Sequence, residues 1–176
     1  MSPRFVFRVL RLDEEPSLGL FPKNPFSNES VARHVNQYNE RDFRSSRYIS
    51  TTASAETAIK WCIWNRRSQD NPAFSMIDTR FLDPTCIIDL TIEDIRNHYI
   101  PDVSDKITRE FAQRSWEVLF TKPIPASAID STWTYMDLVN LSYSYTINIP
   151  RVVSFLESRM IEQVMGELHF DEINQI

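Results

Sequence analysis

The sequence predicts a single α+β domain that spans residues 1–176. A chain of 176 residues has the length of one average domain. Apolar residues make up 42% of the chain and aromatic residues 12%, which is enough for a packed interior and argues against disorder. Short apolar runs typical of strands alternate irregularly with capped segments at helical spacing, and there is no repeat or linker. We therefore expect one core built from both kinds of element.

The first half of the chain predicts two strands and two helices. The run FVFRVLRL is apolar apart from two arginines, which is typical of a strand covered on both faces. Hydroxyl and amide side chains that precede apolar residues at helical spacing predict helix caps. The expected order is a strand at 5–12, a loop at 16–25, a helix capped by Asn28 or Ser30 that ends near Tyr38, a strand at 48–50, and a helix capped by Thr52 or Ser54.

Prolines punctuate the second half of the chain. Pro101 interrupts a helical region, and Pro123 and Pro125 end a strand. Pro150 begins the last helix, because proline suits the first helical turn. The expected elements are strands at 74–81, 86–90, 115–120, 133–138 and 143–149, helical pieces within 92–113 that Thr91 caps, and a C-terminal helix at 150–168 packed on the domain.

The glycine content excludes two classes of nucleotide site. The chain has only two glycines, Gly19 and Gly166. A P-loop and a dinucleotide fingerprint both need several glycines within a few residues, so that backbone amides can approach the phosphates. Any nucleotide bound here must therefore be held by side chains.

Charge and cysteine content narrow the function further. Lys and Arg number 19 against 24 Asp and Glu, and this net charge of −5 argues against a nucleic-acid partner. Cys62 and Cys86 have no disulfide or metal-ligand spacing, so we expect two buried thiols, and the three isolated histidines predict no metal site. The sequence lacks an apolar stretch of signal-peptide or membrane-spanning length, so we expect a soluble, cytosolic protein with no membrane partner.

Four places break the local pattern. Arg8 lies within an apolar strand, where it forms either an internal salt bridge or an anion-binding site. The hydroxyl run at 50–52 is read first as a strand end with a helix cap, and second as a site. For Glu117 the pattern favours a solvent-facing edge over a cleft. His34 lies on an apolar helical stripe, where a histidine is more often a satisfied core residue.

Together and in this order, the motifs resemble those of the mono-ADP-ribosyltransferases, in the Arg–Ser–Glu branch that contains the cholera and pertussis toxin catalytic subunits. The resemblance covers about residues 5–130. It rests on the aromatic-Arg strand at 6–11, the segment YISTTAS at 48–54 with Thr52 in place of the last motif serine, the segment EVLF at 117–120 with its Ile-Pro turn, and His34, which is placed like the helix histidine of the pertussis-like members.

The resemblance implies a split β-sandwich with flanking helices. Such a fold grips NAD in the cleft between two small sheets, with NAD as substrate and without a metal. The resemblance implies that Arg8 contacts a phosphate or ribose of NAD and that His34 hydrogen-bonds to a ribose or phosphate. It implies that Ser50 supports the nicotinamide ribose and that Thr51 and Thr52 shape the end of the strand. It implies that Glu117 is catalytic and accepts a hydrogen bond from the ribose 2′-hydroxyl. Arg11 competes for the role of Arg8 if the strand register is shifted. The aromatic candidates for stacking on nicotinamide are Tyr38, Tyr48, Phe74 and Tyr99.

The implied activity is transfer of ADP-ribose from NAD to a protein side chain, with release of nicotinamide. Two alternatives stay open: an NAD glycohydrolase, and a non-catalytic interaction domain that keeps the fold. The presence of Arg8, Ser50 and Glu117 together favours the enzyme.

The residues before Glu117 bear on the acceptor. Family members that modify arginine carry a glutamate two residues before the catalytic one, and here that position is Ser115, followed by Trp116. A serine cannot act as the second carboxylate, so the resemblance favours a non-arginine acceptor positioned by these two residues. The similar CteC-like bacterial effectors modify a threonine of ubiquitin, which makes ubiquitin one candidate acceptor. For a delivered effector of this type, the site of action is the host cytosol.

Overall fold

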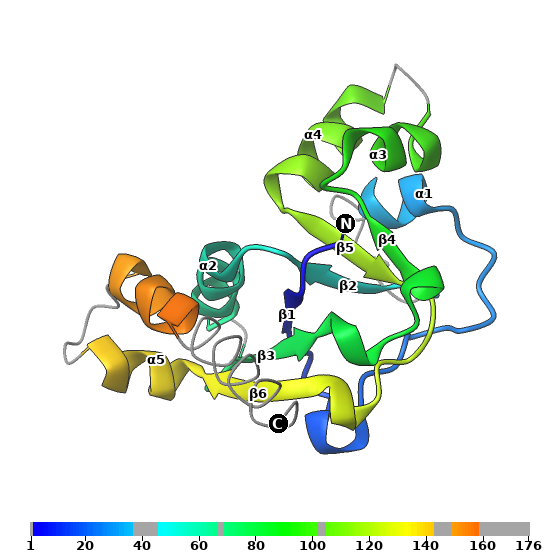
Figure 1. Ribbon diagram of the computed structural model, residues 1–176. Coiled ribbons are helices and arrows are strands. Elements are labelled where there is room, and N and C mark those ends of the chain that lie inside the picture. The colour runs from blue at the N-terminus through cyan, green and yellow to red at the C-terminus, as the bar shows by residue number, and fades with distance from the viewer. Residues whose placement is uncertain (1, 37–45, 67–68, 102–104, 143–148, 159–176) are drawn as a thin grey trace, which may run out of the picture.

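Six strands form one antiparallel sheet in the computed structural model, which describes residues 2–36, 46–66, 69–101, 105–142 and 149–158 (Figure 1). The strand order is β4-β5-β2-β1-β3-β6, so neighbours in the sheet are mostly distant in sequence. The strands are β1 (Phe5–Val9), β2 (Ile49–Thr52), β3 (Ala73–Asp78), β4 (Ile87–Asp89), β5 (Glu117–Phe120) and β6 (Ile129–Thr134). The α+β fold class predicted from the sequence is confirmed.

The sheet is nearly divided between β1 and β2. Within these strands, Phe7 and Thr52 form the only aligned pair, whereas β1 and β3 are aligned over five pairs and β2 and β5 over four. The two halves are β4-β5-β2 and β1-β3-β6, and hydrogen bonding joins them into one sheet through this narrow contact. The two small sheets that the resemblance implies are these halves.

Separate groups of helices cover the two halves (Figure 1). One group packs near the β4-β5-β2 half: α1 (Val31–Asn36), α3 (Glu93–Tyr99) and α4 (Lys106–Arg114). The other packs near the β1-β3-β6 half: α2 (Ala55–Asn65), α5 (Tyr135–Ser142) and the helix at 149–158. None of the helices in the described part of the chain has the length and apolar character needed to cross a membrane.

Three apolar clusters follow from this division. Phe7, Ile59 and Leu156 belong to the cluster between the β1-β3-β6 half and its helices. Val35 and Leu119 belong to the cluster under α1 and α4. A third cluster lies on the opposite face of the sheet, because alternate strand residues point to opposite sides. It contains residues of both halves and holds them together.

Most of the predicted elements are observed, but the strands predicted at 5–12, 74–81 and 115–120 are shorter, at Phe5–Val9, Ala73–Asp78 and Glu117–Phe120. Helix capping explains where the helices start. Ser54 caps α2 and accepts a hydrogen bond from the Thr57 amide at 3.1 Å, as one of the two predicted alternatives required. Ser30 accepts from the Arg33 amide at 3.2 Å at the start of α1. The cap predicted at Thr91 is wrong, since its hydroxyl donates to Asp89 and α3 begins after Ile92.

The strand predicted at 133–138 is also wrong beyond Thr134. The Thr134 backbone amide donates to the Asp137 carboxylate at 2.7 Å, and the Asp137 backbone amide donates to the Thr134 hydroxyl oxygen at 3.2 Å. This reciprocal cap starts α5 at Tyr135 and overrides the strand propensity of the aromatic residues. The strand predicted at 143–149 lies largely outside the described residues, and position 149 already belongs to the last helix. That helix buries Val152 and Leu156 in the core.

Candidate functional site

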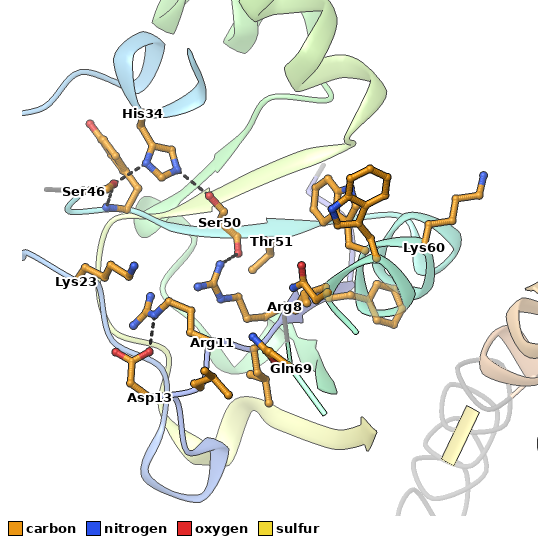
Figure 2. A pocket seen from close by; sticks show the side chains of 18 residues that line it. Arg8, Arg11, Asp13, Lys23, His34, Ser46, Ser50, Thr51, Lys60 and Gln69 are labelled. Atoms are coloured by element: carbon orange, nitrogen blue, oxygen red, sulfur yellow. Dashed lines mark hydrogen bonds and ion pairs between the residues drawn. The ribbon is translucent and has the colours of Figure 1, made fainter. Parts of the chain in front are cut away.

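A cavity of about 750 Å³ opens where the two halves of the sheet separate (Figure 2). Residues of β1 and of the loop after it form one wall of the cavity, and residues at the start of β2 form another. Helix α1 contributes one side chain, and helix α2 contributes several. The polar residues facing it include Arg8, Arg11, Lys23, His34, Ser46 and Ser50. The split in the sheet therefore creates the space, and the residues beside the split determine its chemistry.

Arg8 replaces a strand-to-strand contact at the split. Continued beyond Phe7 and Thr52, the register of β1 and β2 would align Arg8 with Thr51 and then Val9 with Ser50. Instead, the Arg8 side chain crosses the gap, and its Nη1 donates to the Ser50 carbonyl oxygen at 2.8 Å. Its Nη2 forms an ion pair with Glu14 at 3.1 Å. The internal salt bridge considered from the sequence is thus present, and the same guanidinium also lines the cavity.

Glu14 is shared by two arginines. Besides Arg8, its carboxylate lies 3.1 Å from Nη1 of Arg11 and accepts the Arg11 backbone amide at 2.7 Å. The Glu14 side chain is only 2% exposed, so it pairs with both guanidiniums from the buried side. A third carboxylate-arginine contact joins Arg11 Nε to Asp13 at 3.0 Å. Both arginines therefore face the cavity, and either can serve as its main cation.

His34 projects from α1 to the end of β2 (Figure 2). Its Nε2 lies 2.7 Å from the Ser50 hydroxyl, and its Nδ1 lies 2.5 Å from the Ser46 hydroxyl. Burial lowers the pKa of His34 to about 4, and the positive charge of Arg8 acts in the same direction. The ring is neutral at neutral pH, so it works as a hydrogen-bonding group rather than as a cation.

Glu117 is the first residue of β5 and lies behind Ser50 and His34. It is 2% exposed and does not line the cavity. The favoured interpretation of a solvent-facing edge is wrong, because β5 lies inside the sheet between β4 and β2. Burial raises the pKa of Glu117 to about 7, although hydrogen bonds from Ser50 and Ser115 and the charge of Arg8 act against this rise. His34 Nε2 is 4.0 Å from its Oε1.

The two threonines of the Ser-Thr-Thr run fasten β2 to the segment around Glu117. Thr51 donates from Oγ1 to the Val118 carbonyl oxygen at 2.7 Å, and Thr52 donates to the Ser115 carbonyl oxygen at 2.7 Å. Both side chains are buried, and Thr51 also borders the cavity. Thr52 is aligned with Glu117 across the two strands. The threonines thus fix the position of Glu117 relative to Ser50.

Ser115 and Trp116 occupy different environments. Ser115 is buried, and its hydroxyl oxygen lies 2.8 Å from the Phe111 carbonyl oxygen and 3.3 Å from Glu117 Oε2, so these two acceptors share its single proton. Trp116 is 53% exposed and has a φ of 52°, in the left-handed region that bulky residues rarely adopt. Its carbonyl oxygen accepts from the Ala53 amide at 2.9 Å, which holds this strained turn between α4 and β5.

Comparison with known families identifies the chain. A family model described as a domain of unknown function, DUF7587, matches residues 2–138. The chain belongs to the DUF7587 family. No curated protein sequence matches it.

The DUF7587 chain shares its fold with ADP-ribosyltransferase toxin structures. The structure of EcPltA superposes on 75% of this chain and 75% of its own, with a TM-score of 0.54 and 13% sequence identity. Full-length CARDS toxin superposes on 75% of this chain and 24% of its own, with a TM-score of 0.50 and 22% identity. At these identities the likeness is one of fold.

The DUF7587 structure also brings to the cavity residues that the motifs did not indicate. Trp61 and Trp64 of α2 are three positions apart and line it, on a stripe next to the buried stripe of that helix. Of the aromatic candidates expected to stack on nicotinamide, Tyr48 lines the cavity and Phe74 is buried in the core. Tyr99 does not line it, and Tyr38 lies outside the described residues.

The remaining titratable residues in the described part of the DUF7587 chain do not suggest a metal centre. In the described segments, no group of three or more His, Cys, Asp or Glu side chains is arranged to hold a metal ion. Cys62 and Cys86 are both free and buried, as expected. Burial raises the pKa of Cys62 to about 12, so this thiol stays protonated and inert.

Proposed function

We propose that this protein is a mono-ADP-ribosyltransferase that cleaves NAD, releases nicotinamide and transfers ADP-ribose to a protein side chain. The observation that carries the proposal is the meeting of Arg8, His34, Ser50 and Glu117 at one point of the split sheet, beside a cavity. These residues come from four different elements. The fold shared with ADP-ribosyltransferase toxin structures supports the same reaction.

In this cavity, side chains supply the phosphate contacts that a glycine-rich loop supplies in other nucleotide-binding proteins. Arg8, Arg11 and Lys23 give the cavity a cationic wall suited to a pyrophosphate, and the guanidinium geometry matches phosphate oxygens. Trp61 and Trp64 give it an aromatic wall on which a flat base or nicotinamide ring can stack. A dinucleotide carries both chemistries in one molecule. NAD therefore fits the wall composition better than an inorganic phosphate or a purely apolar ligand does.

The reaction breaks the bond between the nicotinamide nitrogen and C1′ of its ribose. Nicotinamide leaves with the bonding electrons, and positive charge develops on the ribose as in glycosidase chemistry. The acceptor side chain then forms the new bond to C1′ and loses its proton. A carboxylate held near the 2′-hydroxyl stabilises this charge more in the transition state than in the ground state. Glu117 takes that role from behind Ser50 and His34, and its carboxylate acts on the ribose through the Ser50 hydroxyl, which lies between Glu117 and the cavity.

Radiolabelled NAD tests the activity and separates it from its alternatives. Purified protein is incubated with NAD labelled in its adenylate part, with eukaryotic lysate or purified ubiquitin, and nicotinamide release is measured in parallel. We expect label on a protein band with wild type and none with Glu117→Gln. Nicotinamide release without any labelled protein would instead identify an NAD glycohydrolase. Absence of both from folded protein would contradict an enzymatic role and support an interaction domain.

The surroundings of Glu117 favour an acceptor other than arginine. Ser115 cannot supply the second carboxylate that would position a guanidinium, and it is occupied by hydrogen bonds to α4 and Glu117. Trp116 presents an exposed aromatic surface next in sequence to Glu117, where an acceptor protein can dock. A hydroxyl acceptor such as a threonine of ubiquitin is consistent with this arrangement, and the labelled band and its modified peptide identify it.

The two arginines at Glu14 are expected to differ in their contribution to NAD binding. Arg8→Gln removes the guanidinium nearest Ser50, and we expect it to weaken NAD binding by about 10- to 100-fold, the effect of losing a charged hydrogen bond. Arg11→Gln should have a smaller effect. Titration calorimetry in the Glu117→Gln background measures binding without turnover, with the exposed Arg33→Gln as control. A larger loss at Arg11 would transfer the role to that residue.

A further inference from the structure

A chain of hydrogen bonds connects Ser46 to Ser50 through His34 and ends beside Glu117. The Ser46 hydroxyl oxygen lies 2.5 Å from His34 Nδ1, and the Ser50 hydroxyl oxygen lies 2.7 Å from His34 Nε2 (Figure 2). The Ser50 side chain also lowers the pKa of Glu117, and His34 Nε2 lies 4.0 Å from Glu117 Oε1, so Ser50 and His34 both lie beside this carboxyl. Ser46 is 7% exposed and lies in the segment before β2, outside the motifs that pointed to the site.

The direction of each bond follows from the donors that are fixed. The Ser46 oxygen accepts the backbone N–H of Tyr48 at 3.0 Å, and a backbone N–H can only donate. Among the described residues, His34 Nδ1 is the only acceptor within hydrogen-bond distance of the Ser46 hydroxyl, so that hydroxyl donates its proton to Nδ1. Because His34 is neutral, only one ring nitrogen carries a proton, and an accepting Nδ1 leaves that proton on Nε2.

The donor and acceptor roles of His34 and Ser50 extend the chain toward Glu117. His34 Nε2–H donates to the Ser50 oxygen, so the hydroxyl proton of Ser50 is free to point at the Glu117 carboxylate. The Ser50 backbone is held separately by Arg8, which donates to its carbonyl oxygen. Each hydroxyl in the chain thus accepts one bond and donates the next, from Ser46 to Glu117.

We propose that Ser46 is a positioning residue that holds His34 as its Nε2–H tautomer and thereby aims the Ser50 hydroxyl at Glu117. Its effect on turnover rests on the proposed function, whereas its effect on His34 and Glu117 does not. Without the Ser46 hydroxyl, nothing selects an accepting Nδ1, and Ser50 can turn to donate to Nε2 instead. Glu117 then loses a hydrogen bond that favours its charged form, and its pKa rises.

Arg8 is the charged group that acts on Glu117, and its contacts do not depend on Ser46. Arg8, on β1, interacts with Glu117 through its charge, and its own bonds to Ser50 and Glu14 do not involve Ser46. His34 faces Glu117 from α1 at 4.0 Å and is neutral in either tautomer. A shift in the titration of Glu117 in a Ser46 variant therefore reports the Ser50 hydrogen bond.

Nuclear magnetic resonance of Ser46→Ala and Ser46→Thr tests the proposal directly. Nitrogen-15 spectra of the histidine rings report the tautomer of His34, and carbon-13 spectra of the Glu117 carboxyl report its titration. We expect the Nε2–H tautomer in wild type and Ser46→Thr, and its loss in Ser46→Ala. The Glu117 midpoint in Ser46→Ala should rise by about one pH unit, which lowers nicotinamide release at pH 7 by about five-fold. Thr108→Val, which deletes a buried hydroxyl in α4, is the matched control.

The outcomes separate this proposal from the proposed function. An Nδ1–H tautomer of His34 in wild type would overturn the proposal, and so would an unchanged Glu117 midpoint in folded Ser46→Ala. Rescue of the tautomer and the midpoint by Ser46→Thr would support it. If wild type leaves NAD intact while both spectra behave as expected, the positioning role stands and the transferase assignment fails.

Discussion

Glu117→Gln is expected to lower the rate of nicotinamide release from saturating NAD by about 10²–10³, the usual loss when one preorganised electrostatic contact is removed. Glutamine keeps the shape of the side chain and its contact with Ser115, but it cannot carry the negative charge that stabilises the ribose cation. NAD affinity should change by less than about two-fold, since the charge matters chiefly in the transition state.

The pH dependence of the wild-type rate gives this prediction a second readout. A pKa of Glu117 near 7 means that the carboxylate fraction rises between about pH 6 and pH 8, so the rate should rise over the same range. His34, with its pKa lowered to about 4, contributes no step in that window. Asp89→Asn removes another buried carboxylate away from the cavity and should retain turnover. Retained turnover in folded Glu117→Gln would refute the catalytic role.

The same substitution is expected to stabilise the fold at alkaline pH. The ordinary pKa of a glutamate, 4.5, applies to the unfolded chain, and burial raises the folded value to about 7. Between these values the unfolded chain releases a proton that the folded protein keeps, so the free energy of unfolding falls as pH rises. Glutamine does not titrate. Relative to wild type, Glu117→Gln should gain about 1 kcal/mol at pH 5 and about 3 kcal/mol at pH 8.

Urea unfolding at pH 5 and pH 8 measures this difference. At each pH, the free energy of unfolding of wild type is subtracted from that of Glu117→Gln. The change in this difference between pH 5 and pH 8 is the result of interest, because any fixed packing effect of the amide cancels from it. If this difference in the free energy of unfolding does not grow with pH, the site of Glu117 does not disfavour the charged carboxylate. A carboxylate that destabilises its own fold and is required for turnover is typical of an active-site residue rather than of a structural one.

The sequence contained enough local information to predict the elements that surround the site. The apolar run around Arg8 predicted β1, and Ser54 predicted the start of α2, because strand patterning and helix caps act over a few residues. The resemblance placed Arg8, His34, Ser50 and Glu117 in one family of sites, and the structure brings these four side chains together.

What the sequence could not provide depends on long-range pairing. The burial of Glu117 follows from β5 lying between β4 and β2, an order that no local pattern contains. Trp61 and Trp64 form a cavity wall only because the sheet splits beside α2. Ser46 looks like an ordinary loop serine until His34 is placed against it. The start of α5 depended on the reciprocal bonds of Thr134 and Asp137, which competed with an aromatic segment of strand type.

A crystal structure of Glu117→Gln with bound NAD tests the central claim most directly, because this variant should bind the dinucleotide without cleaving it. We expect intact NAD in the cavity at the sheet split, with its pyrophosphate at Arg8 or Arg11 and the nicotinamide ribose against Ser50 and His34. NAD bound at another surface, or a cavity that stays free of NAD at millimolar concentration, would contradict it.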